Sequence, residues 1–335
     1  MIDRYAYNPN PPAPQDENLL YRKALRYDTM MIVLMLLAFY VVMNLIAATL
    51  MIIPYLFGTD SVQSFAGGAA GLSFTDALSE TTAQYGSFIS LSTLIAEIVS
   101  LPIFLVIRGG RLFTTDITTV REKMRPAVFA QIFIVAFGAQ FVFTALAALL
   151  NALLGKAGIS ATDTYSTAVE GMMNVPGLIY VMLLGPIMEE IVFRAAIMRH
   201  LEKYGGNFAI VMSAMFFGCY HIFFVQAVFA FPVGILLGYV AHKYSVKWSM
   251  LLHVLYNSAA ILLSALAPSQ TVELAVDTVI FIVAVVLLAT NRRTIRDQIN
   301  TEKPARSETY KIAFSGTSLI LFLVVVAGLS LVLSF

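Results

Sequence analysis

The chain has 335 residues, of which 59% are hydrophobic and only 12% are charged, and its mean hydropathy is +0.81. Because an average soluble domain has about 25% charged residues, this composition excludes an ordinary water-soluble protein and indicates one whose main solvent is lipid. A net charge of +1 without a basic patch argues against nucleic acid as a partner. The single cysteine, Cys219, excludes an internal disulfide and a cysteine-based metal cluster.

The first segment of the chain is polar and rich in proline, with the run NPNPPAP at residues 8–14. Proline interrupts helical hydrogen bonding, and a polar segment of this kind buries too little apolar surface to offset the entropy of ordering it. We therefore predict a disordered cytoplasmic tail over residues 1–28.

Apolar runs then follow one another with little between them, and a membrane-spanning helix needs about 20 apolar residues. The fifth and sixth runs are the hardest to separate, because His221 to Ala230 contains no turn residue. A tight or re-entrant connection there would have to be buried in protein. The sequence predicts an all-α, polytopic transmembrane helical bundle of about eight or nine spans, near residues 30–53, 87–107, 128–152, 176–198, 207–224, 227–243, 248–266, 272–290 and 314–334.

The distribution of lysine and arginine predicts the orientation of this bundle. With nine spans and a cytoplasmic N-terminus, 19 of the 21 basic residues fall in the tail or in cytoplasmic loops. Only Lys156 falls in an outside loop, and Arg194 falls within a span. Since basic residues in short loops resist translocation, this bias favours a cytoplasmic N-terminus. The basic segments are the tail and residues 108–125, 199–203, 243–247 and 292–311.

Three ionisable residues stand together in the fourth predicted span: Glu189, Glu190 and Arg194. Each costs about 2.5–3.5 kcal/mol at the bilayer centre, so pairing or a wet cavity must compensate. Glu190 and Arg194 are four residues apart and stack on one helix face, whereas Glu189 points about 100° away. We expect Glu190 to be neutralised by Arg194, and Glu189 to be free to act as a general base. The alternative is an interhelical salt-bridge cluster without chemistry.

Further polar residues occur on two later spans. His221 follows Phe217 by one helical turn, and His253 and Asn257 are four residues apart on one face. A lone histidine in an apolar helix is more often a packing residue than a catalytic one, so each histidine by itself is only weak evidence for a catalytic site. Helix rise places Glu189, His253 and Asn257 near mid-membrane, and His221 nearer the outer side. We therefore predict that the three spans bring these polar side chains together at one site.

These residue types favour hydrolysis by activated water. Glu189 would take a proton from water, His221 would orient that water, and His253 and Asn257 would donate to the developing oxyanion of a peptide carbonyl. The same chain has no GxSxG and no HExxH motif. Glu189, His221 and His253 would also suit a catalytic zinc ion, and the sequence leaves both versions open: no cofactor, or zinc.

The three motifs resemble those of the CPBP family of intramembrane proteases, which includes the type II CAAX prenyl endopeptidases and bacterial Abi-type homologues. They stand at residues 189–194 (EEIVFR), 217–221 (FGCYH) and 253–257 (HVLYN), in the order and spacing of the family. The resemblance covers roughly residues 170–265. It implies that Glu189 is the catalytic carboxylate, that His221 shares in activating water, and that His253 and Asn257 form the oxyanion site. Glu190 and Arg194 would stabilise the site through their pair.

The resemblance also implies an organisation of the chain. We expect N-terminal transmembrane helices over residues 29–165, a protease-like catalytic core over 166–268, and C-terminal transmembrane helices over 269–335. The substrate would be a peptide or protein in or at the lipid bilayer. Short loops and a compact tail favour a bacterial plasma membrane. We therefore do not assign the family's prenylated substrates to this protein.

Two other functions remain open from the sequence. One is a non-catalytic immunity or scaffold protein that keeps the motifs but works by binding. The other is a proton-coupled transporter, which would need further polar residues along a path. Glu97 and Gln140 are candidates, and their simpler interpretation is an interhelical hydrogen bond; Asp277 is expected near the outer end of the eighth span.

Overall fold

The computed structural model of the chain describes residues 14–57, 74–157, 160, 162–301 and 305–334. In these ranges every regular element is a helix, which confirms the all-α prediction. The α-helices are α1 (Pro14–Phe57), α3 (Phe74–Ser100), α4 (Leu105–Arg108), α5 (Pro126–Leu154), α6 (Asp163–Gly171), α7 (Val175–Ile179), α8 (Gly185–Glu190), α9 (Arg199–Leu201), α10 (Gly206–Tyr220), α11 (Phe224–Lys243), α12 (Val246–Leu266), α13 (Gln270–Thr290), α14 (Arg292–Thr301), α15 (Thr309–Phe314) and α16 (Thr317–Ser334). The 3-10 or π-helical turns are η1 (Leu101–Phe104), η2 (Leu112–Asp116), η3 (Gly155–Ala157), η4 (Tyr180–Leu184), η5 (Ile191–Met198) and η6 (Glu202–Tyr204).

Among the described residues, seven helical stretches are long and apolar enough to cross a membrane, so the protein is an integral, multi-pass membrane protein. Two further apolar helices, α10 and α16, are shorter. The exact number of spans and the cytoplasmic N-terminus stay predictions. The seven stretches are Glu17–Leu50, Tyr85–Arg108, Pro126–Leu154, Val175–Tyr204, Phe224–Lys243, Val246–Leu266 and Gln270–Thr290.

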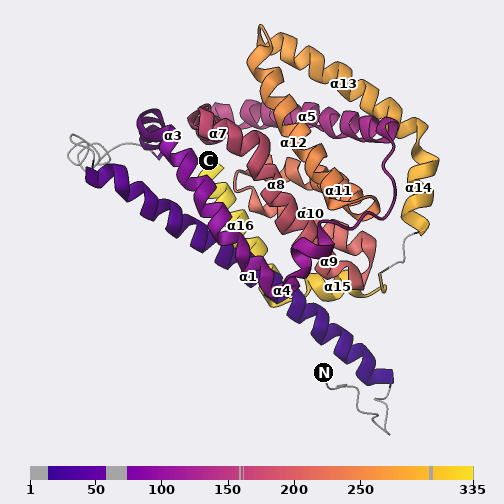
Figure 1. Cartoon of the computed structure of the whole chain (residues 1–335). Coiled ribbons are helices and arrows are strands. Elements are labelled where there is room, and N and C mark those ends of the chain that lie inside the picture. Colours follow the sequence, from indigo (N-terminus) through magenta and orange to yellow (C-terminus); the bar gives the residue numbers. More distant parts are fainter. Residues whose placement is uncertain (1–13, 58–73, 158–159, 161, 302–304, 335) are drawn as a thin grey trace.

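The helices surround a central group. In Figure 1, α1 and α3 lie side by side along one margin, and α5 and α13 lie side by side along the opposite one. Helices α8, α10, α11 and α12 lie between these two pairs. The fourth predicted span, which carries the two adjacent glutamates, is therefore enclosed by other helices rather than placed at the lipid-facing edge.

The predicted disordered tail over residues 1–28 is wrong for its second half. Helix α1 begins at Pro14, a residue whose fixed φ and missing N–H suit the first turn of a helix. Leu25 is fully buried, and Asp28 accepts a hydrogen bond of 2.6 Å from the Tyr204 hydroxyl. These tertiary contacts order a stretch that is polar by composition. Residues 1–13 lie outside the described residues.

Helices α10 and α11 form a tight hairpin over the stretch where the fifth and sixth runs were hardest to separate. Helix α10 ends at Tyr220 and α11 begins at Phe224, so only residues 221–223 connect them. The two helices approach closely because glycines face the contact: a Cβ atom at Gly218 would lie 2.9 Å from the Ala227 carbonyl oxygen. Gly234 faces α10 in the same way, because an added Cβ atom would lie 3.2 Å from Ala214 of α10.

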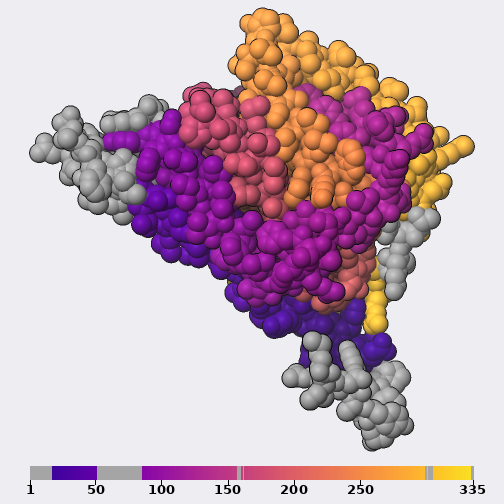
Figure 2. Space-filling view, in the orientation of Figure 1, coloured from indigo at the N-terminus to yellow at the C-terminus, as the bar shows by residue number. Residues whose placement is uncertain are grey.

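The basic segments meet at one end of the molecule. Arg121 donates to the Glu202 carboxylate at 2.6 Å, and its backbone N–H donates to the Tyr244 carbonyl at 2.8 Å. Lys203 pairs with Asp28 at 2.6 Å. Arg22 also pairs with Glu308. Figure 2 shows the violet-to-magenta segment over residues 109–125 lying on the near face of the molecule. All five segments predicted to be cytoplasmic are thus on the same side.

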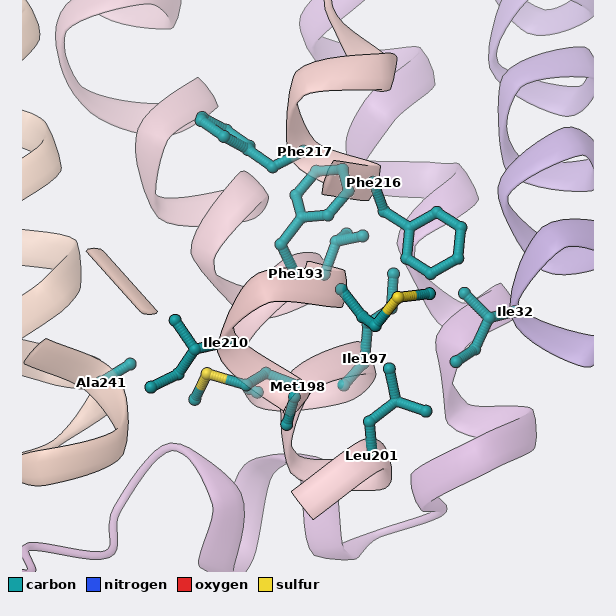
Figure 3. Close-up of a cluster of buried hydrophobic side chains, with 14 of the residues drawn as sticks. Ile32, Phe193, Ile197, Met198, Leu201, Ile210, Phe216, Phe217 and Ala241 are labelled. Atoms are coloured by element: carbon teal, nitrogen blue, oxygen red, sulfur yellow. The ribbon is translucent and has the colours of Figure 1, made fainter. Parts of the chain in front are cut away.

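The apolar core lies directly beside the fourth span. Figure 3 shows Phe193 and Ile197 from η5 on the side of Phe216 of α10 and Ile32 of α1, with Met198 turned the other way. All five side chains are at most 1% exposed. Close packing on this side leaves η5 little freedom to rotate, so the polar residues on its other side are held in a fixed direction.

Candidate functional site

The two adjacent glutamates end a short α-helix that lies between two π-helical stretches. Helix α8 contains Glu189 and Glu190, η4 precedes it and η5 follows it. The wide turn of η4 closes with a hydrogen bond from the Gly185 N–H to the Tyr180 carbonyl, directly before Pro186. Such π-helical insertions occur often at functional sites. The Gly185-Pro186 pair is the sequence signal for this irregularity.

Glu190 is completely buried and fully engaged. Its Oε1 lies 3.1 Å from Nη1 of Arg194, so the predicted ion pair is present. The same oxygen is 3.1 Å from Nδ1 of His253, and Oε2 accepts a hydrogen bond of 2.5 Å from Ser249. One carboxylate thus joins η5 to α12, as expected for a charge that is buried only with several partners.

Arg194 is buried to the same extent and is held from three sides. Besides the pair with Glu190, its Nη2 donates to the Gly234 carbonyl at 3.2 Å. Its guanidinium carbon lies 4.4 Å from the ring centroid of Phe217, a cation–π contact. The phenylalanine of the second motif therefore contacts the arginine of the first.

Glu189 faces a different environment. Its side chain is 14% exposed and lines a cavity of about 460 Å³. It makes no ion pair with Arg194 of the kind that Glu190 makes, but its Oε2 lies 3.6 Å from Nε2 of His253. The sequence did not predict this neighbour, because the two residues are 64 positions apart and on different helices.

The cavity brings the other predicted site residues to Glu189. His221, His253 and Asn257 all line it, together with residues from α1, α5, α6 and α11. His221 stands at the end of α10, in the short connection to α11. The tight hairpin turn therefore places its imidazole in the cavity, and its depth in the membrane stays a prediction.

Hydrogen bonds fix how each of these side chains is oriented. Nδ1 of His221 is 2.9 Å from the Phe217 carbonyl oxygen, which can only accept, so Nδ1 carries a proton and Nε2 is left as an acceptor. Nδ1 of His253 is bound by the Glu190 carboxylate in the same way. Asn257 donates one amide N–H to the Val181 carbonyl at 3.0 Å, which leaves its second N–H available.

A metal ion does not fit this arrangement as it stands. Glu189, His221 and His253 have the chemistry of a zinc set, and all three line the cavity. However, among the residues that the structure describes, no three His, Cys, Asp or Glu side chains are grouped closely enough to hold a metal ion. The roles assigned below therefore use only groups of the chain.

Ser249 was missed by the sequence reasoning. It precedes His253 by four residues and so lies on the same face of α12. Its hydroxyl is fully buried and donates to Glu190. The stripe of Ser249, His253 and Asn257 along one face of the helix is the signal that would have found it.

The polar residues considered for a transport path do not form one in the described part of the chain. Gln140 accepts a hydrogen bond of 2.9 Å from the Tyr256 hydroxyl, as the interhelical interpretation predicted. Glu97 is buried on α3 at 1% exposed, and its Oε2 has no hydrogen-bond partner. Asp277 is 3% exposed on α13, and its Oδ1 has no hydrogen-bond partner.

Comparison with known proteins gives one match. Residues 171–259 match the family model described as "Type II CAAX prenyl endopeptidase Rce1-like". No curated protein and no solved structure matches the chain. The matched segment contains all three motifs, which confirms the predicted resemblance to the CAAX-protease-like family. The similarity supports protease activity in general, and it leaves the remaining helices of the chain outside the match.

Proposed function

Because residues 171–259 are similar to the Rce1-like type II CAAX prenyl endopeptidases, we propose that this membrane protein is an intramembrane endopeptidase. The observation that carries the proposal is that Glu189, His221, His253 and Asn257 line one cavity between the helices. We propose that residues 166–268 are its catalytic core. The substrate is a peptide in the membrane or next to it.

Glu189 is the general base of the proposed reaction. A water molecule in the cavity attacks the carbonyl carbon of the peptide while its proton passes to the Glu189 carboxylate. Nε2 of His221, left as an acceptor by the bond from Nδ1 to Phe217, accepts a hydrogen bond from the same water and orients it. When the tetrahedral intermediate collapses, Glu189 returns the proton to the leaving amine and the C–N bond breaks.

Asn257 and His253 stabilise the oxyanion of the intermediate. Asn257 uses the amide N–H that Val181 leaves free. His253 donates from Nε2, which requires the doubly protonated ring because Nδ1 already donates to Glu190. The buried Glu190 carboxylate stabilises that imidazolium, so its role is to orient and charge His253 while remaining paired with Arg194.

The cavity supports an apolar substrate segment. Its lining contains aromatic and apolar side chains, among them Phe143, Tyr165 and Phe229. A cavity of about 460 Å³ of this composition holds large apolar side chains next to the scissile bond. Prenylated and unprenylated peptides therefore both belong in the substrate test.

The test is peptide cleavage by the purified protein in lipid nanodiscs, with a quenched peptide library. We expect Glu189→Gln to lower kcat/KM by about 10²–10⁴-fold, the usual contribution of a positioned general base. Glu122→Gln is the matched control, because its carboxylate is 60% exposed outside the cavity, and we expect it to cleave like the wild type. Equal cleavage by the wild type and Glu189→Gln would overturn the proposal in favour of a binding protein or a carrier.

A further inference from the structure

A group of exposed arginines directly follows the last of the seven span-length helices. Arg292, Arg293 and Arg296 lie in the first half of α14, and all three are exposed. Together with Asp297 they line one hollow in the surface. Helix α14 begins two positions after α13 ends at Thr290, so this group stands at the boundary of the membrane. Figure 1 shows α14 at the margin of the molecule, beyond the end of α13.

These arginines differ from other exposed basic residues at the same end of the molecule, because they have no acidic partner. Arg22, Lys203 and Arg306 are about half exposed, yet each of them forms an ion pair with a carboxylate. Within the described part of the chain, the three arginines of α14 form neither an ion pair nor a hydrogen bond, even with Asp297 beside them. Like charges four positions apart destabilise a helix, so an anion from outside the chain would relieve their repulsion.

A contact on the opposite side of α14 fixes the direction in which the arginines point. The Tyr239 hydroxyl donates a hydrogen bond to Oε1 of Gln298, which fastens α14 to α11. At 3.6 residues per turn, the three arginines fall within an arc of about 100°, and Gln298 lies about 120° or more round the helix from each of them. The cationic face is therefore turned away from α11 and towards the surroundings of the protein.

The place of this face determines which anion it meets. The lipid headgroups lie next to the end of a membrane span, and basic groups directly beyond a span attract anionic lipids. A guanidinium group also binds phosphate oxygens through two parallel N–H donors, which gives arginine a geometric match to a phosphate. Three arginines and one aspartate give α14 a net charge of +2, which complements a headgroup of negative charge.

We propose that Arg292, Arg293 and Arg296 form a binding site for the phosphate of an anionic phospholipid headgroup, in the leaflet at the predicted cytoplasmic end. A lipid bound there neutralises the arginines and holds the end of α13 against the headgroup layer. None of the three arginines lines the cavity of Glu189, so the inference is separate from the proposed protease reaction.

The experiment is a lipid titration of the purified full chain in a neutral detergent, with bound lipid counted by native mass spectrometry. Phosphatidylglycerol is the anionic probe, and phosphatidylcholine, which has no net charge, is the reference. We expect the wild type to bind phosphatidylglycerol more tightly. The triple variant Arg292→Gln, Arg293→Gln and Arg296→Gln is expected to lose about a hundredfold in affinity for phosphatidylglycerol, with little change for phosphatidylcholine.

A matched control removes the same amount of charge elsewhere at this end of the molecule. Lys23, Arg111 and Lys123 are also exposed, but they belong to two other segments of the chain. We expect the triple variant Lys23→Gln, Arg111→Gln and Lys123→Gln to bind phosphatidylglycerol like the wild type. An equal loss in the two triple variants would reduce the effect to net charge and overturn the site, as would an unchanged affinity in the α14 variant.

Two further measurements complete the test. Thermal unfolding in neutral detergent is expected to be the same for the wild type and the α14 variant. If that variant does not fold, Arg293→Gln alone is titrated, with an expected loss of about fivefold. Inorganic phosphate is added as a competitor, and displacement of the lipid at equal concentration would overturn the proposal in favour of a free anion. The titration uses no cleavage, so its result does not depend on the proposed function.

Discussion

At the scale of single residues, two adjacent and identical side chains have different surroundings. Glu190 is enclosed by Arg194, His253 and Ser249, whereas Glu189 is partly exposed in the cavity. The difference follows from the direction in which each side chain leaves the helix and from what lies on that side. It supports the division of roles between a positioning carboxylate and a base.

The Glu190–Arg194 pair is a testable part of this division. Arg194→Met leaves the Glu190 carboxylate buried without its cation, and we expect it to lower the free energy of unfolding by about 3–5 kcal/mol. Denaturant unfolding in detergent micelles measures this. The double variant Arg194→Met with Glu190→Gln is the control, since it removes both charges and should recover much of the loss. Equal stability of Arg194→Met and the wild type would contradict the assigned pairing.

The use of a metal is also tested at this scale. Because the described side chains are not grouped to hold a metal ion, we expect cleavage by the wild type to survive exhaustive treatment with a chelator. The zinc version of the site, on Glu189, His221 and His253, predicts instead that activity disappears and returns when Zn²⁺ is added back. The cleavage assay before and after chelation measures the difference directly.

At the scale of elements, the hairpin of α10 and α11 places His221 in the site. The chain reverses over residues 221–223, where the end of α10 leaves the helix without a turn signal in the sequence. The reversal is compact because Gly218 and Gly234 let the two backbones approach. An apolar hairpin of this kind is stable only when other helices enclose it.

The close packing of the hairpin predicts that one methyl group added at Gly218 will lower both stability and cleavage. A Cβ at Gly218 would meet the backbone carbonyl of Ala227 at 2.9 Å, a contact that no side-chain movement relieves. We expect Gly218→Ala to lower stability by about 1–3 kcal/mol and to reduce cleavage by displacing His221. Gly328→Ala on α16 is the matched control, because nothing lies within 4 Å of its added methyl group. Thermal unfolding and the peptide assay on both variants test this, and equal values would refute it.

At the scale of the whole molecule, the site depends on helices that the family match does not cover. Residues from α1, α5 and α6 complete the cavity. The basic segments lie together at one end, linked by contacts such as Arg121 with Glu202 and Lys203 with Asp28. This common end is what the predicted orientation requires, since basic loops stay in the cytoplasm.

The orientation is tested by labelling from one side. In a Cys219→Ala background, Lys156→Cys and Arg293→Cys each place a thiol at an exposed residue, at the predicted outer and inner ends. We expect a membrane-impermeant maleimide to label Lys156→Cys in intact cells, and Arg293→Cys only after permeabilisation. The reverse pattern would invert the predicted topology without affecting the site.

The sequence by itself determined the membrane class, the helical architecture, the Glu190–Arg194 pair and the family resemblance. Each of these depends on composition, on spacing within one helix, or on motifs that are local in the chain. Only the tertiary structure decided that α1 extends back to Pro14, that His253 is bound by Glu190, and that His221 lines the same cavity as Glu189. These contacts join helices far apart in the sequence. In an almost uniformly apolar chain, helical periodicity does not say which faces meet, because lipid and protein neighbours both suit an apolar side chain.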